Sequence, residues 1–550
     1  MATAMKNEIE QLDAVIVGAG AAGLYMLHRL RGLGLKTTVI EAGDGVGGTW
    51  YWNRYPGARC DVTSVEYSFS FDKQLEQEWN WTEMMAPQPE IELYMNHVAD
   101  RFDLRRDIRF STRVTDVNWN DRASTWTVAT DKGDLIEARY CIMATGCLSS
   151  PLKPDIKGID SFNGVSVQTS MWPREGIELE GKRVALIGTG SSGVQSTPEI
   201  AKVVSQLTVF QRTPTYTWPS MNRPLTAEDI AKVKANYAKM RQTQRSSRVG
   251  IAGSFGGALL EPPTAKLLDL PEEERRQKLD EHGFAVTRMF ADVATDMEAN
   301  IVAREMYAEM LRRVVTDPDT AAALTPSDYP IGCKRAVVDQ DYFVTFNRPN
   351  VKLVDLRNEP FEEVTEKGIR TSTGEYELDV IVYATGFDAM TGALLNMNIK
   401  GRESRPLAEK WAAGPRNYLG LMAEGFPNLF TITGPGSPSV LSNMLVSIEQ
   451  HVDWITECLS YLGANGKNVI EPTLEAEDSW VEHVNTVADG TMYTAPSCNS
   501  WYLGANVPGK TRQFMPYVGG VGVYRQKCDE VVAKGYDGFV LDTAREAVAV

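Results

Sequence analysis

Two glycine-rich turns constrain the fold of this chain more than any other feature of its sequence. GAGAAG at residues 18–23 follows the apolar run AVIV, and GTGSSG at residues 188–193 follows RVALI; each turn leads into a helical pattern. The first Gly of such a turn allows a tight bend, the second lets the backbone approach a pyrophosphate, and the third lets the helix pack on the strand. We therefore predict an α/β fold with two Rossmann-like dinucleotide-binding domains.

The strands that follow the two turns end in residues of opposite charge. Glu41 lies 18 residues after Gly23, where a carboxylate accepts hydrogen bonds from ribose hydroxyls. Arg212 lies 19 residues after Gly193, where a guanidinium pairs with a 2′-phosphate and Thr213 adds a hydroxyl. One acid and one base indicate FAD at the first turn and NADPH at the second, with hydride passing between them. A solvated arginine that ends a strand is the alternative interpretation of Arg212.

Composition limits the kinds of partner that the chain can have. Among its 550 residues 56 are basic and 72 acidic, and the net charge of -16 disfavours binding to nucleic acid or to an anionic membrane. A polar N-terminus and the lack of an apolar run near ~20 residues predict neither a signal peptide nor an integral membrane segment. We expect a cytoplasmic small-molecule enzyme without a metal site; the oligomeric state stays open, and a monomer is compatible with the sequence.

The cysteines are sparse and unpaired in sequence. No CxxC occurs among the seven, which are Cys60, Cys141, Cys147, Cys333, Cys458, Cys498 and Cys528. This pattern predicts free thiols in a reducing compartment. The pyridine-nucleotide disulfide reductases share a plan of two nucleotide units but place two cysteines a few residues apart early in the FAD unit. Because Cys60 stands alone there, a thiol relay is disfavoured.

The domain organisation follows from a repeated ending. Strand-rich stretches after each turn close with ATG, at residues 144–146 and 384–386, which marks two parallel halves. Residues 225–330 carry charged helical segments around GIAGSFGGALLEPP and predict a helical insertion with a mobile loop. The predicted domains are 1–150 (FAD, first part), 151–224 (NADP, first part, with 151–180 as interdomain linker), 225–330 (insertion), 331–388 (NADP, second part) and 389–550 (FAD, second part, with substrate and NADP-covering loops).

The stretch GGTWYWNRYPGARCD at residues 47–61 strongly resembles the signature of the type I Baeyer–Villiger monooxygenases, which are class B flavoprotein monooxygenases. The likeness continues through ATGFDA, GPGSPSVLSNM and SWYLGANVPGK over nearly the whole chain, and looks nearest to the phenylacetone and steroid monooxygenase branch. The family fingerprint FxGxxxHxxxWP is matched by Phe162, Gly164, Trp172 and Pro173, but Gln168 replaces its His.

The resemblance implies a reaction and its cofactors. NADPH would reduce FAD, dioxygen would add to form a C4a-peroxyflavin, and a cyclic, aromatic or steroidal ketone would become an ester or lactone. Such anionic oxygens need a permanent cation, and the resemblance assigns this role to Arg335, oriented by Asp61. Lys334 would contact NADP, and Trp501 would cover its nicotinamide when a loop closes. The residues expected to shape the ketone pocket are Ser439, Val440, Leu441 and Met444.

The same matching implies two sets of cofactor-binding residues. The set for FAD is Gly18, Gly20, Ala22, Gly23, Glu41, Gly48, Thr49, Trp50, Asp61, Tyr67, Val114 and Met444. The set for NADP is Thr189, Gly190, Ser191, Ser192, Gly193, Gln195, Arg212, Thr213, Lys334, Arg335 and Trp501.

Two other functions compete with this interpretation. One is a flavin-dependent monooxygenase that oxygenates nitrogen or sulfur, whose related fingerprint ends in another aromatic residue in place of Trp172 and Pro173. The other is a flavoprotein reduced to NADP binding or redox sensing by the loss of His at position 168. Because Gln, like neutral His, offers both a donor and an acceptor at similar reach, we expect residues 162–173 to be a structural crossing between the units and Gln168 to be tolerated.

Overall fold

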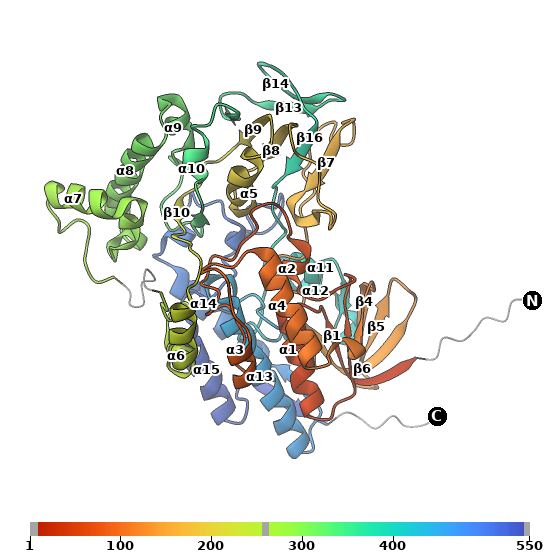
Figure 1. Ribbon diagram of the computed structural model, residues 1–550. Coiled ribbons are helices and arrows are strands. Elements are labelled where there is room, and N and C mark those ends of the chain that lie inside the picture. The colour runs from red at the N-terminus through yellow and green to blue at the C-terminus, as the bar shows by residue number, and fades with distance from the viewer. Residues whose placement is uncertain (1–8, 256–262, 544–550) are drawn as a thin grey trace, which may run out of the picture.

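The computed structural model describes residues 9–255 and 263–543 and contains two main sheets, one below the other in Figure 1. The lower sheet has the strand order β17-β4-β5-β6-β1-β2-β3, with β18 paired to β6. Its strands are β1 (Glu10–Val17), β2 (Thr37–Ile40), β3 (Ile108–Arg109), β4 (Val114–Asn120), β5 (Thr125–Thr130), β6 (Leu135–Met143), β17 (Asn398–Lys400) and β18 (Leu429–Thr431).

The upper sheet repeats the central part of the lower one. Its five strands run parallel in the order β12-β9-β8-β16-β7. They are β7 (Val165–Gln168), β8 (Arg183–Ile187), β9 (Gln206–Gln211), β12 (Val351–Asp355) and β16 (Val380–Tyr383). In each sheet the strand before the glycine turn lies between the strand after it and the strand that ends in ATG, so the α/β class and the two Rossmann-like units predicted from the sequence are confirmed.

Small sheets complete the strand inventory of the described residues. One is β10 (Thr217–Pro219) with β11 (Val337–Asp339), one is the antiparallel set β13 (Phe361–Val364), β14 (Gly368–Thr371) and β15 (Gly374–Glu377), and one is β19 (Val469–Pro472) with β20 (Phe539–Asp542).

Helices near the lower sheet come from both ends of the chain. In α1 (Ala21–Gly32) the predicted apolar positions Leu24, Leu27 and Leu30 are fully buried, and this helix packs against α13 (Met444–Ala464). This contact joins the helix after the first glycine turn to the C-terminal region. The other helices of this part are α2 (Thr49–Trp52), α3 (Lys73–Glu78), α4 (Gln88–Arg101), α11 (Gly392–Leu395), α12 (Leu407–Lys410), α14 (Leu474–Ala488) and α15 (Val521–Ala533).

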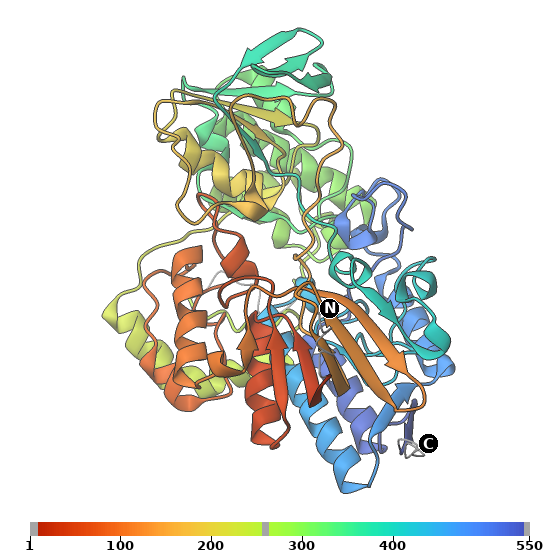
Figure 2. The same ribbon diagram turned by 90° about the vertical axis from the view of Figure 1, so that its right-hand side faces the viewer.

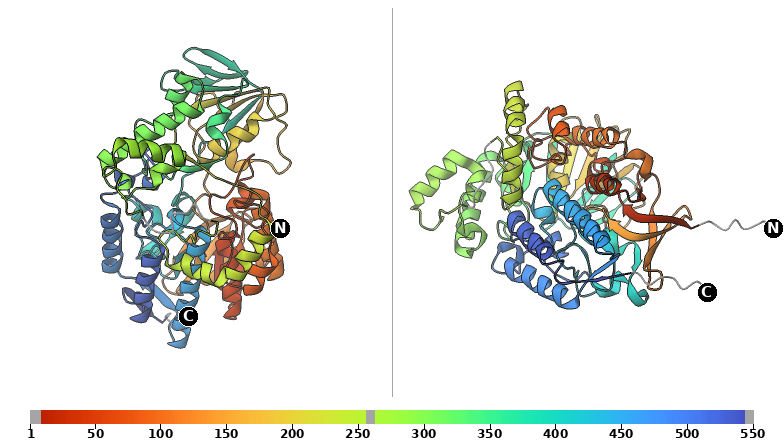
Figure 3. Two further views of the ribbon diagram at one scale, coloured as in Figure 1. Left: turned by 60° about the vertical axis from the view of Figure 1, so that its left-hand side comes forward. Right: turned by 90° about the horizontal axis from the view of Figure 1, so that it is seen from below.

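The region predicted as one helical insertion divides its packing between the two units. Helix α6 (Ala227–Ser246) lies against the lower unit, where Arg241 forms a buried ion pair with Glu76 at 2.7 Å. Helices α7 (Glu272–His282), α8 (Met297–Val314) and α9 (Pro318–Leu324) lie beside the upper sheet, on the side away from β4 and β5 (Figure 3). The upper unit also holds α5 (Ser191–Ala201) and α10 (Tyr342–Thr345). Residues 256–262, the centre of the predicted mobile loop, lie outside the described residues.

One strand from the predicted linker belongs to the upper sheet. Strand β7 forms its edge and pairs with β16, with Gln168 opposite Tyr383. Figure 2 shows the chain crossing between the two units beside this edge. The division into domains at the stated boundaries remains a prediction. Within the described ranges, no helix is long and apolar enough to span a bilayer.

Candidate active site

The first glycine turn is tightly enclosed by neighbouring backbone. Gly18 has φ +105°, and a Cβ there would lie 2.6 Å from the carbonyl oxygen of Ala144, in the first ATG. Gly20 is the N-cap of α1 and has no side-chain cap, while a Cβ on it would lie 3.3 Å from the Cα of Gly48. Ala22 and Gly23 complete the first helical turn. Unfilled backbone donors at a side-chain-free helix start fit a pyrophosphate.

Glu41 lies directly beside this turn. Its buried carboxylate accepts hydrogen bonds from the backbone N–H groups of Ala19 (2.6 Å) and Gly43 (2.7 Å). Burial raises the pKa of Glu41, although these two N–H groups favour its charged form. The Glu41 carboxylate, which is predicted to bind the ribose, thus lies at the turn and is held there by backbone N–H donors.

The segment after Glu41 packs over the same turn. Gly48 is the N-cap of α2, which contains Thr49 and Trp50, and the Trp50 indole N–H donates to the Tyr67 hydroxyl at 3.2 Å. Burial raises the pKa of Tyr67. Two other predicted FAD residues stand at the starts of elements around the turn: Val114 at β4 and Met444 at α13.

The second glycine turn has the same backbone form but is more open. Gly188 has φ +109°, and a Cβ there would lie 2.5 Å from the carbonyl oxygen of Ala384, in the second ATG. Gly190 is the N-cap of α5 without a side-chain cap, and no described atom would lie within 4 Å of a Cβ on it. The Thr189 hydroxyl donates to the carbonyl oxygen of Thr213 at 2.7 Å, which ties the turn to the end of β9. Ser191, Ser192 and Gly193 form the first turn of α5.

Gln195, also predicted to bind NADP, connects the two units. Its side-chain oxygen Oε1 accepts a hydrogen bond from the Tyr55 hydroxyl at 2.8 Å, and its side-chain Nε2 donates to the backbone carbonyl oxygen of Arg59 at 3.0 Å. The family-like stretch around Tyr55 is therefore docked on helix α5 of the upper unit, close to Asp61.

Two cations meet at the end of β9. Arg212 is exposed, and Lys334 comes from the loop before β11 with its ammonium 4.3 Å from the centroid of the Tyr329 ring. Burial lowers the pKa of Lys334, and the positive charge of Arg212 lowers it further. Within residues 9–255 and 263–543 neither cation has an ion-pair partner. Two adjoining cations without a carboxylate fit a phosphate monoester.

Arg335 is held from two sides. Its guanidinium pairs with the Asp61 carboxylate at 2.7 Å and donates to the carbonyl oxygen of Val440 at 2.7 Å. Burial is the largest single influence on the pKa of Arg335 and lowers it, but the negative charge of Asp61 together with smaller contributions from neighbouring tyrosines and Cys60 raises the pKa overall. The structure thus brings together a loop after the insertion, the family-like stretch and the C-terminal region around one permanent cation.

The Val440 carbonyl belongs to a short turn with a constrained backbone. Ser439, at the start of the 3-10 turn Ser439–Leu441, has φ +37°, which is unfavourable for a residue with a side chain. Its buried hydroxyl lies 3.1 Å from the sulfur of Cys147. Sequence reasoning named Ser439, Val440 and Leu441 for the ketone pocket but missed this carbonyl contact, because a backbone acceptor has no sequence signature.

An aromatic cluster adjoins Arg335. Trp501 is half-buried and begins the 3-10 turn Trp501–Leu503, with its ring centroid 4.3 Å from that of Tyr502. Tyr502 is fully buried, and its hydroxyl has no hydrogen-bond partner among the described residues. Burial raises the pKa of Tyr502, opposed by the positive charge of Arg335. Sequence reasoning missed Tyr502, although its place directly after Trp501 in SWYLGAN was a usable signal.

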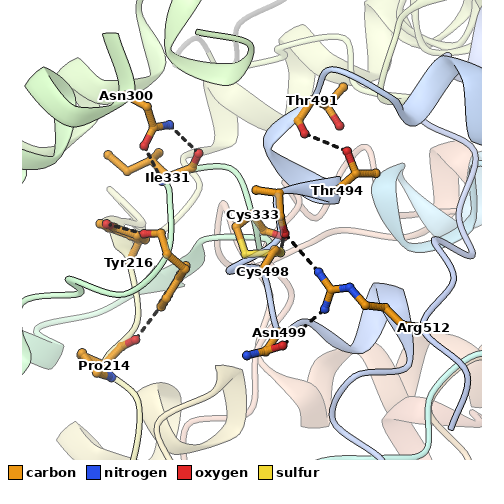
Figure 4. Close-up of a disulfide and its surroundings, with 12 residues drawn as sticks. Pro214, Tyr216, Asn300, Ile331, Cys333, Thr491, Thr494, Cys498, Asn499 and Arg512 are labelled. Atoms are coloured by element: carbon orange, nitrogen blue, oxygen red, sulfur yellow. Dashed lines mark hydrogen bonds between the residues drawn. A yellow bond between two sulfur atoms is a disulfide. The ribbon is translucent and has the colours of Figure 1, made fainter. Parts of the chain in front are cut away.

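The prediction that all cysteines are free thiols is wrong for two of them. Cys333 and Cys498 form a disulfide whose partners are 165 residues apart (Figure 4). The error arose because sequence spacing carries no signal for a pair brought together only by the fold. The other five cysteines are free and buried.

Gln168 serves as a hydrogen-bond donor in the crossing. Its side-chain amide donates to the carbonyl oxygen of Leu152 at 3.2 Å, and the Thr385 hydroxyl donates to the same oxygen at 3.0 Å. The side chain thus links Leu152, in the predicted linker, to the second ATG.

Comparison with known proteins gives consistent relatives. The model of the family described as pyridine nucleotide-disulphide oxidoreductase matches residues 15–252, which span both glycine turns. Acetone monooxygenase (methyl acetate-forming) from Gordonia sp. (strain TY-5) is 41% identical over 96% of this chain and 99% of its own. A Baeyer-Villiger monooxygenase from Pseudooceanicola batsensis is 40% identical over 98% and 97%, and phenazine N-monooxygenase from Lysobacter antibioticus is 39% identical over 97% and 98%.

Solved structures agree with these relatives. Oxidized steroid monooxygenase bound to NADP superimposes with a TM-score of 0.90 and 50% identity, over 97% of this chain and 99% of that chain. OTEMO in complex with FAD and NADP gives a TM-score of 0.91 and 39% identity, over 97% and 100%.

Proposed function

The chain belongs to the Baeyer–Villiger monooxygenases, and from this premise we propose how its own residues carry out the reaction. The activity is the NADPH- and dioxygen-dependent insertion of one oxygen atom next to a ketone carbonyl, which yields an ester or a lactone. FAD and NADP are its cofactors. The observation that carries our assignment of the site is the Arg335 guanidinium, held between Asp61 and the Val440 carbonyl at the meeting of the two units.

Arg335 supplies the permanent positive charge. Bound FAD, once reduced by NADPH, supplies the electrons that activate dioxygen. The oxygen that attacks the ketone and the alkoxide that follows are both anionic, and a fixed guanidinium stabilises each without moving a proton. The ion pair with Asp61 orients the planar guanidinium of Arg335. The hydrogen bond to the Val440 carbonyl holds it from a second side, so the position of the positive charge is fixed.

The nucleotide-binding roles follow from the two turns. We assign FAD to the first turn, with the pyrophosphate at the start of α1 and the residues Gly18, Gly20, Ala22, Gly23, Glu41, Gly48, Thr49, Trp50, Asp61, Tyr67, Val114 and Met444 around it. We assign NADP to the second, with the residues Thr189, Gly190, Ser191, Ser192, Gly193, Gln195, Arg212, Thr213, Lys334, Arg335 and Trp501. The unpaired cations Arg212 and Lys334 support a 2′-phosphate, and hence NADPH rather than NADH.

The substrate class is a ketone that reaches the turn Ser439–Leu441 and the start of α13. We propose cyclic, aromatic or steroidal ketones, with Ser439, Val440, Leu441 and Met444 shaping the pocket. The likeness to a steroid monooxygenase supports large ketones, whereas an acetone monooxygenase among the relatives supports small ones. A cytoplasmic location also remains a proposal.

Product analysis tests this function. Purified protein supplied with FAD and NADPH is offered linear, aryl, monocyclic and steroidal ketones under ¹⁸O-labelled dioxygen. The expected result is ketone-stimulated NADPH consumption and an ester that carries one labelled oxygen atom. Peroxide as the sole product with every ketone would overturn the proposal.

Oxygenation of nitrogen or sulfur is the second candidate, favoured by the phenazine N-monooxygenase among the relatives. Competition between a ketone, a phenazine and a sulfide at equal concentration separates the two. We expect ester to dominate; an N-oxide formed in preference to every ester would assign the chain to the alternative.

A further inference from the structure

The disulfide between Cys333 and Cys498 joins the two segments that flank the proposed site. The two Cα atoms lie 5.5 Å apart, and both side chains are fully buried. Cys333 directly precedes Lys334 and stands two residues before Arg335, and Cys498 stands three residues before Trp501. One covalent bond therefore connects the loop of the cation to the loop of the proposed nicotinamide cover.

The Cys333 end is fastened to the upper unit. The amide of Asn300, on helix α8, donates to the carbonyl oxygen of Ile331 at 2.9 Å and accepts a hydrogen bond from the Ile331 N–H at 3.1 Å (Figure 4). The Tyr216 hydroxyl donates to the carbonyl oxygen of Tyr329 at 3.2 Å. The loop that ends in Arg335 thus has a rigid base.

The Cys498 end is fastened to the C-terminal region. The Cys498 N–H donates to the carbonyl oxygen of Ala495 at 2.8 Å. Arg512 donates to the same carbonyl at 3.0 Å and to the side chain of Asn499 at 3.3 Å. The Thr491 hydroxyl caps the end of α14 through the carbonyl oxygen of Ala488 at 2.7 Å. Each end is anchored separately, so the disulfide fixes the spacing between two bodies.

We propose that Cys333 and Cys498 are positioning residues whose cross-link holds Arg335 and Trp501 at the spacing needed to retain NADP while the ketone reacts. This inference rests on the proposed function. Loops that close over a site are drawn from the less stable parts of a protein, and an extra constraint narrows the arrangements that they sample. Misplacement of a positioned group by about 1 Å costs a large share of catalytic rate. Loss of the cross-link therefore loosens NADP binding and lets reducing equivalents escape as peroxide.

Cleavage of the cross-link is a two-electron reduction that a dithiol can supply. One thiolate of dithiothreitol attacks a cysteine sulfur and expels the other cysteine as a thiolate. The second thiol of the reagent then closes its own ring, so the reagent becomes a cyclic disulfide and the protein gains two thiols. Because both sulfurs are buried, substitution is the cleaner way to remove the bond.

The first measurement tests whether the disulfide between Cys333 and Cys498 is present in the purified protein. The full chain is denatured in the presence of an alkylating reagent, digested without reductant and mapped by mass spectrometry. We expect one peptide pair joined through Cys333 and Cys498, which dithiothreitol separates. Complete alkylation of both residues in the untreated protein would overturn the proposal.

The second measurement compares Cys333→Ala, Cys498→Ala and the double variant with Cys141→Ala as a matched control. Cys141 is equally buried, in β6 of the lower sheet, and has no disulfide. For each single variant we expect the Kd of NADP⁺ to rise about five-fold, with a lower yield of ester per NADPH and unchanged FAD content. The double variant should be no worse than either single one, because both remove the same bond.

Two results would contradict this. Additive losses in the double variant would show that each sulfur acts by packing alone, and equal losses in Cys141→Ala would show a general effect of core substitution. The titration with NADP⁺ needs no turnover. If the wild-type chain forms no ester, the proposed function fails while the titration still tests the cross-link.

Discussion

The two nucleotide units share one backbone plan and differ in what surrounds it. In both, the first glycine of the turn has a positive φ and abuts the alanine carbonyl of an ATG sequence, Ala144 in one unit and Ala384 in the other. In the first unit the turn is covered by Gly48 and helix α2, and the charged residue, Glu41, is buried. In the second, the space beside Gly190 is open.

This difference separates a retained cofactor from an exchanged one. A nucleotide whose pyrophosphate lies under a covering segment must wait for that segment to move before it dissociates, whereas the pyrophosphate at the open turn is not enclosed and retention depends on contacts elsewhere, such as the proposed Trp501 cover. NADP⁺ must leave after each turnover, while FAD is needed in every cycle. Part of the positive charge proposed to select the second nucleotide comes from Lys334, which lies outside the turn on the loop that carries Arg335.

Removal of the cation between the units should have the largest effect. Arg335→Ala should lower ester formation about 10³-fold, because the anionic oxygens lose their fixed positive charge. The reduction of FAD by NADPH in the absence of dioxygen should continue. Stopped-flow absorbance follows the reduction, and chromatography follows the ester. An unchanged ester yield would remove Arg335 from the catalytic role, and Arg348→Ala, at an exposed arginine between α10 and β12, is the control.

Adding one methyl group at the second glycine of each turn should affect the stability of the two units differently. Gly20→Ala should lower the free energy of unfolding by about 1 kcal/mol and reduce FAD content, because a Cβ there would lie 3.3 Å from the backbone Cα of Gly48. Gly190→Ala should keep stability within about 0.5 kcal/mol but raise the KM for NADPH, because its Cβ points into open space that the pyrophosphate needs. Thermal unfolding and flavin absorbance measure both; equal stability losses would contradict the comparison.

Removing a phosphate-binding cation should affect the second unit alone. Arg212→Ala should raise the KM for NADPH about 30-fold, corresponding to about 2 kcal/mol, with little change for NADH. Steady-state kinetics with each nucleotide measures the ratio, and FAD content is the internal control. An equal loss with NADH would show that Arg212 acts on the fold.

The pH dependence of NADP⁺ binding tests whether the charge of Arg212 affects the protonation of Lys334. Burial and then Arg212 lower the pKa of Lys334, so its charge is lost at a lower pH than that of an ordinary lysine. The Kd of NADP⁺ should therefore rise as pH increases through this pKa. In Arg212→Ala the rise should begin at a higher pH, because the repelling charge is gone. A rise at the same pH in both proteins would contradict the coupling.

The smallest effect is expected in the crossing between the units. Gln168→His should keep kcat/KM within about two-fold of wild type, because a neutral imidazole can also donate to the Leu152 carbonyl. Gln168→Leu should lower the ester yield per NADPH a few-fold, corresponding to about 1 kcal/mol for the lost hydrogen bond. A native chain that is inactive until His is introduced would show that position 168 has a chemical role.

Much of the fold could be predicted because local patterns agree with it. RVALI is strand β8, TWTVAT is strand β5, and the predicted helix after GTGSSG ends at Ala201, one residue beyond its expected end at Ile200. The helical insertion was harder to predict. Its helices were evident from their composition, but α6 packs on one unit and α7 to α9 lie beside the other, and a charged helix does not reveal in sequence which surface it will cover.

Residue types at short spacings determined the two dinucleotide units and the charges at their strand ends, and the resemblance of longer motifs indicated the family; the role of Arg335 as the central cation stays a prediction. Only the tertiary structure decided what meets that cation. The Asp61 carboxylate contacts Arg335 from 274 residues earlier in the sequence, and the Val440 carbonyl contacts it from 105 residues later. The disulfide joins Cys333 to Cys498, 165 residues further along the chain. Contacts between distant segments depend on how whole layers pack, and no local pattern encodes that spacing.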